Sequence, residues 1–318
     1  MYVAWLAYMQ AAGRWGLFRT DWYMTATMVV GSLVAGASSE GGGAIAYPVM
    51  TLAFDIDPAI ARNFSLAIQS VGMTAATAWI VARRIPIETR YLWLAGLGGV
   101  AGVVGGTIWV APHVPAAYAK MMFVSFWLAY GIALFVINHV ERTGTVRELP
   151  ELDPGEQAQL VAIGAVGGVL SAIFGNGIDI CLFSYVTLRY RLSEKVATPT
   201  SVVLMAGIAV VGAVLHAGII GDMQPQAVDF WLVSIPVVVL GAPAGAWVVS
   251  RVPRLAIAGL LYAVIVVQFV TAVWIIRPGP SLIGFSAAVF AFGAFLFFWL
   301  AFRHRTGPDG GTKPAGKS

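Results

Sequence analysis

Two pairs of short apolar segments, each interrupted by a glycine-rich break, decide the fold of this sequence. The later pair reads AQLVAIGAVGGVLSAIF at residues 158–174 and IDICLFSYVTL at 178–188, with Gly175-Asn176-Gly177 between them. The earlier pair reads MTATMVVGSLVAGAS at 24–38 and AIAYPVMTLAF at 44–54. Each arm is shorter than the roughly 20 residues that cross a bilayer as one helix. Gly-interrupted segments in matching places are typical of duplicated membrane folds.

The composition indicates an integral membrane protein. Of the 318 residues, 59% are hydrophobic and 11% are charged, whereas about a quarter are charged in soluble domains. The mean hydropathy is +0.82. Helices satisfy their own backbone hydrogen bonds in hydrocarbon, so we predict an all-α, polytopic transmembrane bundle rather than a barrel. Further apolar segments lie at 63–82, 91–111, 117–139, 198–220, 228–250, 254–276 and 282–302.

Charge and cysteine content exclude several other classes of protein. The formal net charge of +4 comes from basic residues in short loops and a tail, where topogenic charges lie, so we expect no nucleic-acid partner. The single Cys181 excludes an intrachain disulfide, and the four histidines are too scattered for a zinc cluster. We therefore expect no metal, no cofactor and no catalytic residue.

The N-terminal segment has no basic residues before its apolar stretch, so we do not interpret it as a cleaved signal peptide. Its aromatic residues suit an amphipathic segment at the membrane interface. The predicted parts of the chain are an interfacial segment (1–21), a first membrane repeat (22–139), a linker (140–157), a second membrane repeat (158–276), an extra transmembrane helix (277–303) and a disordered basic tail (304–318).

The two halves are related by an internal repeat. A shift of 136 positions places Gly41 on Gly177 and Ser65 on Ser201. If the basic loops lie in the cytoplasm, the pair at 158–188 enters and leaves the membrane on one side. Each break is then the tip of a re-entrant hairpin, and the repeats are inverted. The alternative is one long broken crossing in each half, which makes the repeats parallel.

These motifs resemble the TauE/SafE family of sulfite and organic-anion exporters. In the first half the resemblance rests on Gly41-Gly42-Gly43-Ala44-Ile45-Ala46-Tyr47-Pro48 and on the later stretch from Ala61 to Ser65. In the second half it rests on Ala197-Thr198-Pro199-Thr200-Ser201, and it covers residues 24–276. The resemblance implies export of sulfite, sulfonates or related small anions, driven by an ion gradient.

The glycine breaks supply the predicted substrate site. Glycine lets the backbone turn and leaves N–H groups uncovered, and the helix that follows brings its positive dipole end to mid-membrane. Two such ends bind a small oxyanion without an arginine, and we find no arginine or lysine deep in any segment. The alternative is that the glycines serve close helix packing. The predicted substrate-binding residues are Ser38, Ser39, Gly41, Gly42, Gly43, Asn63, Ser65, Gly175, Asn176, Gly177, Thr200 and Ser201.

Two carboxyl groups are the predicted ion-coupling residues. Among the 15 acidic residues, only Glu40 and Asp179 lie inside apolar stretches, and the TauE/SafE pattern has small residues near these positions. A charge there costs about 2.5–3.5 kcal/mol on insertion scales, so such residues usually have a function. We predict that they carry protons, with Na⁺ binding as the alternative. A third interpretation is that each carboxylate caps the adjacent half-helix.

Several other polar residues have a structural interpretation beside a functional one. Arg62 is expected to be topogenic, or to attract anions to an entrance. His216 is expected to be a satisfied interfacial histidine, with titration near neutral pH as the alternative. Pro199 fits the first turn of a helix. For Asn63, Ser65, Thr198 and Ser201, N-capping of the next helix is an equal alternative to a role in substrate binding.

The sequence thus favours a secondary transporter, in fact an exporter, of small anions. No Walker-type phosphate-binding run is present. A passive anion channel is the first alternative. An intramembrane enzyme acting on lipid phosphates is less well supported, because the two acids have no basic or nucleophilic partners. From the family we expect a multi-pass protein of the bacterial cytoplasmic membrane, in contact with lipid and compatible with a homo-oligomer.

Overall fold

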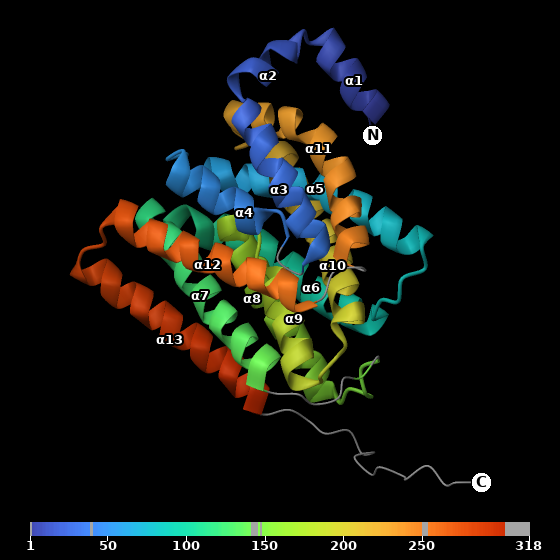
Figure 1. The fold of residues 1–318 in the computed structure, drawn as a ribbon, viewed down its shortest axis with the longest axis vertical. Coiled ribbons are helices and arrows are strands. Elements are labelled where there is room, and N and C mark those ends of the chain that lie inside the picture. Colours follow the sequence, from blue (N-terminus) through green and yellow to red (C-terminus); the bar gives the residue numbers. More distant parts are fainter. Residues whose placement is uncertain (1, 39–40, 141–145, 147, 250–253, 303–318) are drawn as a thin grey trace.

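The chain folds into a bundle of helices around the two broken segments (Figure 1). The computed structural model describes the backbone of residues 2–38, 41–140, 146, 148–249 and 254–302. The regular elements of these residues are all helical, which confirms the predicted all-α bundle. The α-helices are α1 Tyr2–Ala11, α2 Leu17–Thr20, α3 Trp22–Ala37, α4 Gly43–Pro48, α5 Pro58–Ala82, α6 Thr89–Gly105, α7 Ala116–Val140, α8 Pro154–Phe174, α9 Ile178–Arg189, α10 Glu194–Val214, α11 Pro225–Val249, α12 Arg254–Ile276 and α13 Pro280–Phe302.

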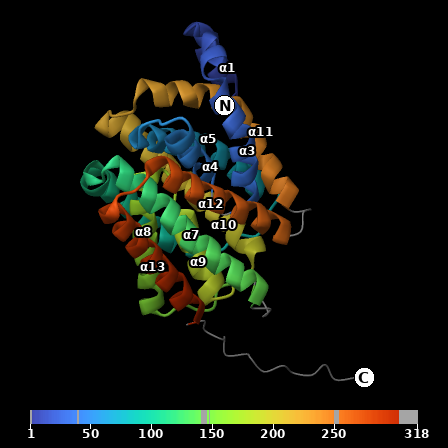
Figure 2. The same ribbon diagram turned by 60° about the vertical axis from the view of Figure 1, so that its left-hand side comes forward.

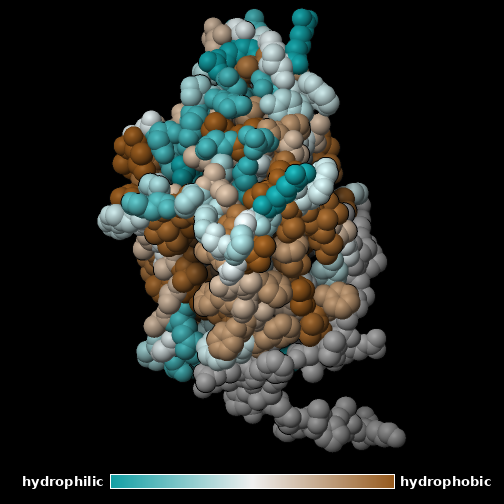
Figure 3. Space-filling view, turned by 90° about the vertical axis from the view of Figure 1, so that its left-hand side faces the viewer, coloured by the Kyte–Doolittle hydropathy of each residue, from teal (hydrophilic) through white to brown (hydrophobic). Residues whose placement is uncertain are grey.

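Seven helices in the described part of the chain are long and apolar enough to cross a membrane. They are α5, α6 with its continuation, α7, α8, α10, α11 and α13. Large apolar side chains point outward from them, including Trp93 on α6, Leu240 on α11 and Phe295 on α13. Figure 3 shows hydrophobic residues gathered over the middle of one side of the molecule and hydrophilic residues at its upper end. The protein is therefore a multi-pass membrane protein.

Helix ends gather at two opposite faces of the bundle. At the first, Tyr23 at the start of α3 meets Phe54, which follows α4, with ring centroids 4.6 Å apart. Asn63 near the start of α5 donates a hydrogen bond to Gln224 just before α11, at 2.8 Å. The starts of α3, α5 and α11 and the end of the α4 segment thus share one end of the bundle, which we call face one.

The opposite end, face two, is joined by contacts around the start of α8. The Leu149 N–H donates to Glu88 Oε2 at 3.1 Å, and the Glu88 N–H donates to Thr200 Oγ1 at 3.0 Å. The Ser193 N–H donates to Val146 O at 2.6 Å. These bonds connect the loop between α5 and α6, the segment before α8 and the start of α10.

Both broken pairs return to the face from which they start. The α3–α4 pair begins and ends at face one. The α8–α9 pair begins at face two, where Arg189 near its end contacts Glu156 near its start at 3.6 Å. Two hairpins therefore enter the bundle from opposite faces, as inverted repeats require. The first residues of α5 and α10 lie 136 positions apart, as do those of α6 and α11. The repeat relation itself stays a prediction.

Glycines let each hairpin lie directly on a crossing helix of the other half. Helix α8 packs along α6, and α3 packs along α11. A Cβ on Gly102 of α6 would overlap the backbone of Ala165 on α8, whose carbonyl carbon would be 2.8 Å away. Gly36 of α3 has the same relation to Ala242 of α11. Close packing of small residues, the alternative role of the glycines, is present at these contacts.

Two helices begin earlier than the sequence predicted. The N-cap of α5 is Asp57, whose carboxylate accepts from the Ala59 N–H at 2.8 Å. Helix α10 begins at Glu194 with Ser193 before it. Polar residues further along resemble caps in the sequence, but they face the interior of the bundle. Asn63, Ser65, Thr198 and Ser201 lie inside helices, so the N-capping roles expected for them are wrong. Pro199 also lies beyond the first turn of α10, so its expected first-turn position is wrong as well.

Three helices end in π-helical stretches, and in the described residues all three lie toward face one. Val49–Ala53 follows α4, Gly106–Val110 follows α6 and Leu215–Ile220 follows α10. A π-helix closes its hydrogen bonds over five residues instead of four, and in proteins it is frequent at functional sites.

The two terminal parts pack on the bundle in different ways. The α1–α2 segment packs against α11 at face one (Figure 2). Trp5 Nε1 donates to Leu232 O at 2.9 Å, and Arg14 pairs with Asp229. Its role at a membrane interface stays a prediction. Helix α13, outside the repeated region, packs along α7 (Figures 1 and 2). It belongs to the bundle.

Candidate functional site between the two breaks

The two breaks meet inside the bundle. Gly41 has a φ of +68°, in the left-handed region that favours glycine. A Cβ on Gly41 would lie 2.5 Å from Gln69 Oε1, 2.9 Å from Asp179 Oδ2 and 3.2 Å from Asn176 Oδ1. Oxygens from α5 and from the second hairpin therefore converge beside the first hairpin. All three side chains are at most 2% exposed.

Gln69 lies halfway along the crossing helix α5, which places this cluster at mid-depth. Its Nε2 donates to Ser65 O at 3.1 Å and to Gly175 O at 2.7 Å. The two bonds set the orientation of the amide, so Oε1 faces Gly41. Neither Gln69 Oε1 nor Asp179 Oδ2 has a hydrogen-bond partner among the described residues. Both oxygens are acceptors, and a proton on the Asp179 carboxyl group is one way to satisfy both of them.

The N-terminus of α9 is occupied by side chains of its own hairpin. The Ile178 N–H donates to Ser171 Oγ at 3.1 Å, and the Ile180 N–H donates to Asp179 Oδ1 at 3.0 Å. The expectation of uncovered N–H groups is wrong for these two residues. Asp179 therefore has a capping contact through Oδ1, the third interpretation offered above, while its Oδ2 is directed to the cluster.

Some of the predicted substrate-binding residues come together at the cluster. Gly41 and Asn176 are part of it, and a Cβ on Gly43 would be 2.8 Å from Asn176 Cβ. Ser65 lies directly against Gly175, where an added Cβ would be 2.5 Å from Ser65 Cβ. Ser65 Oγ is fully buried and has no hydrogen-bond partner in the described structure.

Other predicted residues lie away from the cluster. Asn63 is at face one and Thr200 is at face two. Ser201 Oγ lies 3.3 Å from the Tyr91 hydroxyl on α6. Gly42 faces Met28 and Ala35, Ser38 Oγ donates to Val34 O at 2.9 Å, and Gly177 turns the chain with a φ of +143°. Ser39 and Glu40 lie outside the described residues, so the ion-coupling role of Glu40 stays a prediction.

A polar network closes face one over the cluster. His216 Nδ1 lies 2.6 Å from Asp222 Oδ1, and Arg62 reaches Asp222 Oδ2 at 3.5 Å. Arg62 is 7% exposed and His216 is 0% exposed. Arg62 lies near the start of α5 and is buried there because the loop at 221–224 covers it, so it is not an exposed loop charge. His216 is buried rather than interfacial, and its Nε2 has no partner among the described residues.

Face two is closed by the loop before α6 and the start of α10. The Glu88 N–H bonds Thr200, and Tyr91, which is 0% exposed, lies beside Ser201. Between these two closures, the cluster side chains Gln69, Asn176 and Asp179 are at most 2% exposed.

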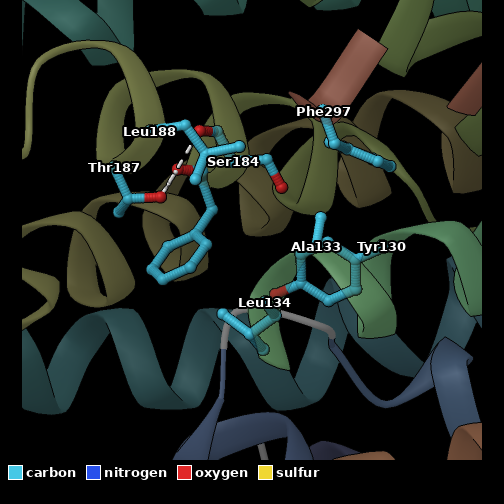
Figure 4. Close-up of a pocket in the computed structure, with 8 residues that line it drawn as sticks. Tyr130, Ala133, Leu134, Ser184, Thr187, Leu188 and Phe297 are labelled. Atoms are coloured by element: carbon cyan, nitrogen blue, oxygen red, sulfur yellow. Dashed lines mark hydrogen bonds between the residues drawn. The ribbon is translucent and has the colours of Figure 1, made fainter. Parts of the chain in front are cut away.

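Little free space is left in this closed form. One cavity of about 10 Å³ lies beside Gly42 and Gln69, between α3, α5 and α11, with mainly apolar walls. Another of about 10 Å³ lies between α7, α9 and α13, where Thr187 Oγ1 turns back onto the Phe183 carbonyl of its own helix (Figure 4). Neither cavity holds more than about one water molecule, so a larger ligand enters only if the bundle opens.

Linking the two sides of the face-one closure is expected to stop transport. With Asn63 and Gln224 both replaced by cysteine, a short bifunctional thiol-reactive linker spans the positions that now share a 2.8 Å hydrogen bond. Flux into proteoliposomes should fall by about tenfold or more and return when a reducible linker is cleaved, because the opening is blocked. The two single-cysteine proteins are the controls. Full flux in the linked double variant would show that this face does not open.

The crossing helices and the two broken hairpins define a polytopic membrane protein with the architecture of a transporter. Residues 23–275 match the family model described as sulfite exporter TauE/SafE. The chain belongs to the TauE/SafE family, and the resemblance seen in the sequence is confirmed. Comparisons with curated proteins and with solved structures found no match. The family is one of membrane transporters that export sulfite and other anions.

Proposed function

We propose that this protein is a secondary transporter that exports a small anion, either sulfite or an organosulfonate or related organic acid. The observation that carries the proposal, beside the family, is the buried cluster to which both hairpins contribute. A site made from both halves changes its accessibility when one half rocks against the other. Asp179, Gln69 and Gly41 are the centre of that site.

We propose further that Asp179 couples anion export to proton movement. The carboxyl group is 1% exposed, and its Oδ2 faces a second acceptor, Gln69 Oε1, beside Gly41. A proton on Oδ2 turns that oxygen into a donor toward Gln69 and removes a buried charge. Na⁺ between the same oxygens is the alternative. The proton is preferred because one hydrogen bond satisfies both groups.

We propose the bacterial cytoplasmic membrane as the location, with face two in the cytoplasm. Basic residues of short loops lie on the cytoplasmic side in most helical membrane proteins. The loops and helix ends at face two carry Arg83, Arg84, Arg90, Arg189, Arg191 and Lys195. The orientation is tested by the reactivity of single cysteines, placed at Arg84 and at Asp55, toward an impermeant thiol reagent in intact cells.

The proposed function is tested by flux into proteoliposomes with an imposed pH gradient. Sulfite, sulfate, sulfoacetate, taurine and simple carboxylates are offered in turn. We expect sulfite or a sulfonate to accumulate above equilibrium and to be released when a protonophore collapses the gradient. A sodium gradient tests the alternative coupling ion.

The other outcomes of that measurement identify the alternatives. Flux that stops at equal concentrations, whatever the gradient, would indicate a passive anion channel. Absence of flux for every anion would contradict the transporter proposal and return attention to an enzyme acting on lipid phosphates.

A further inference from the structure

The described side chains that face Gly41 present acceptor oxygens rather than the donors that recognise an anion. Gln69, Asn176 and Asp179 present these oxygens, and Asp179 adds a carboxyl group. At α9, the N–H groups of Ile178 and Ile180 are already bonded within the hairpin. An oxyanion binds where N–H and O–H donors converge. If the protein carries an anion, the donors must lie elsewhere along the same path.

Arg62 is the buried cation nearest to the tip of the second hairpin. Its carbonyl oxygen would lie 2.6 Å from a Cβ on Gly175. The side chain is only 9% exposed. Its guanidinium donates to Asn63 Oδ1 at 3.0 Å and reaches Asp222 Oδ2 at 3.5 Å, a distance at the limit of a hydrogen bond. An arginine has five donors in a fork that suits oxyanions, so donor capacity is left over.

Two buried hydroxyl groups without a partner in the described structure lie beside the tip of the second hairpin. Tyr47, on α4, is 0% exposed, and its ring packs against Phe174 at the end of α8 with centroids 5.6 Å apart. Its hydroxyl has no hydrogen-bond partner among the described residues. Ser65 is one turn after Arg62 on α5, 0% exposed, and its hydroxyl also has no partner there. A buried hydroxyl without a partner costs about 1–3 kcal/mol, so such groups usually serve a ligand.

We infer that Arg62, Tyr47 and Ser65 form the oxyanion subsite, just under the closure of face one. The subsite takes a sulfite or sulfonate group, with the guanidinium and the two hydroxyls donating to its oxygens. In the closed form the Asp222 carboxylate holds the guanidinium in place of the anion. An anion that displaces Asp222 releases the loop at 221–224, so binding and opening of face one are linked.

The positions on α5 explain how an anion and a buried acid share one path. Arg62, Ser65 and Gln69 are spaced by three and four residues, so they lie on one side of the helix. Arg62 and Gln69 are seven positions apart, which corresponds to about 10 Å along the axis. The anion is therefore separated from the Asp179 carboxyl, and the tip at Gly175 contacts both ends of this row.

The inference rests on the proposed function and is tested by binding rather than flux. Radiolabelled sulfite and sulfoacetate are titrated onto the purified full chain in detergent. Arg62→Gln should weaken binding by about 100-fold, as expected for loss of charge-assisted hydrogen bonds, and Tyr47→Phe by about fivefold. Asp222→Asn should tighten binding, because it weakens the internal competitor of the anion.

The controls separate the possible failures. Arg14→Gln removes a guanidinium and Tyr118→Phe removes a phenol hydroxyl elsewhere toward face one. Both variants should bind sulfite and sulfoacetate as the wild type does. Tyr47→Phe breaks no hydrogen bond of the described structure, so its folding, checked by gel filtration and melting, should be unchanged. Wild-type affinity in both Arg62→Gln and Tyr47→Phe would overturn the subsite. A wild type that binds neither anion would instead contradict the proposed function.

Discussion

Asp179→Asn is expected to abolish gradient-driven accumulation of the anion while leaving the fold intact. Asparagine has the same shape and retains an oxygen for the Ile180 N–H. Its amide nitrogen can donate to Gln69 Oε1, so the cluster is satisfied permanently and no proton is exchanged. A pH gradient of about one unit supports about tenfold accumulation for one coupled proton, since 1.4 kcal/mol is a factor of ten. That accumulation should fall to the equilibrium level.

The measurement compares the two proteins in proteoliposomes, with and without the gradient. Asp229→Asn, at face one in the ion pair with Arg14, is the matched control and should accumulate the anion normally. Anion exchange between equal concentrations is recorded beside accumulation. If Asp179→Asn still concentrates the anion, the coupling role is contradicted and Asp179 is left with its capping contact alone.

Gly102→Ala is expected to destabilise the protein strongly, because an added Cβ has no room between α6 and α8. The added Cβ would lie 2.8 Å from the carbonyl carbon of Ala165 and 2.9 Å from its Cα, and closer still to its oxygen. These are backbone atoms of α8, so no side chain can move aside. Overpacking of this kind costs about 1–3 kcal/mol and displaces the α8–α9 hairpin from α6. The melting temperature should fall by several degrees.

Gly207→Ala is the control for this prediction, because a Cβ at Gly207 of α10 meets nothing within 4 Å. In the interior of a helix this change should be neutral or stabilising by about 0.5–1 kcal/mol. Thermal melting in detergent, followed by gel filtration, compares the two variants. Equal melting temperatures would mean that α6 and α8 are not packed as closely as described.

Most of the architecture was predictable from the sequence, because a bilayer leaves few choices. Apolar runs of known length mark the crossing helices, and the two glycine breaks mark the hairpins. Helix starts were less accurate, since Asn63 and Thr198 have the composition of caps although Asp57 and Ser193 stand before the helices. In a membrane protein, small polar residues also line the interior, and composition does not separate the two roles.

The site was predictable only in part. The breaks pointed to Gly41, Asn176 and Asp179, which do lie together. Gln69 was not among the predicted substrate-binding residues, because nothing in the sequence indicates that it faces the breaks. Arg62 was assigned to topology, since a basic residue near a helix start usually lies in water. Its burial arises from a loop more than 150 positions away, at Asp222, and no local pattern contains that contact.

The three π-helical stretches distinguish the two faces of the bundle in how readily their helix ends can move. A π-turn becomes α-helical when it sheds one residue, which rotates and shifts the helix end without breaking the rest of the helix. In the described chain such π-helical ends occur toward face one, after α4, α6 and α10. We therefore expect opening toward face one and opening toward face two to cross barriers of different height. In the proposed coupled transporter, this difference sets the rates of loading and release, whereas the final concentration ratio follows from the ion gradient.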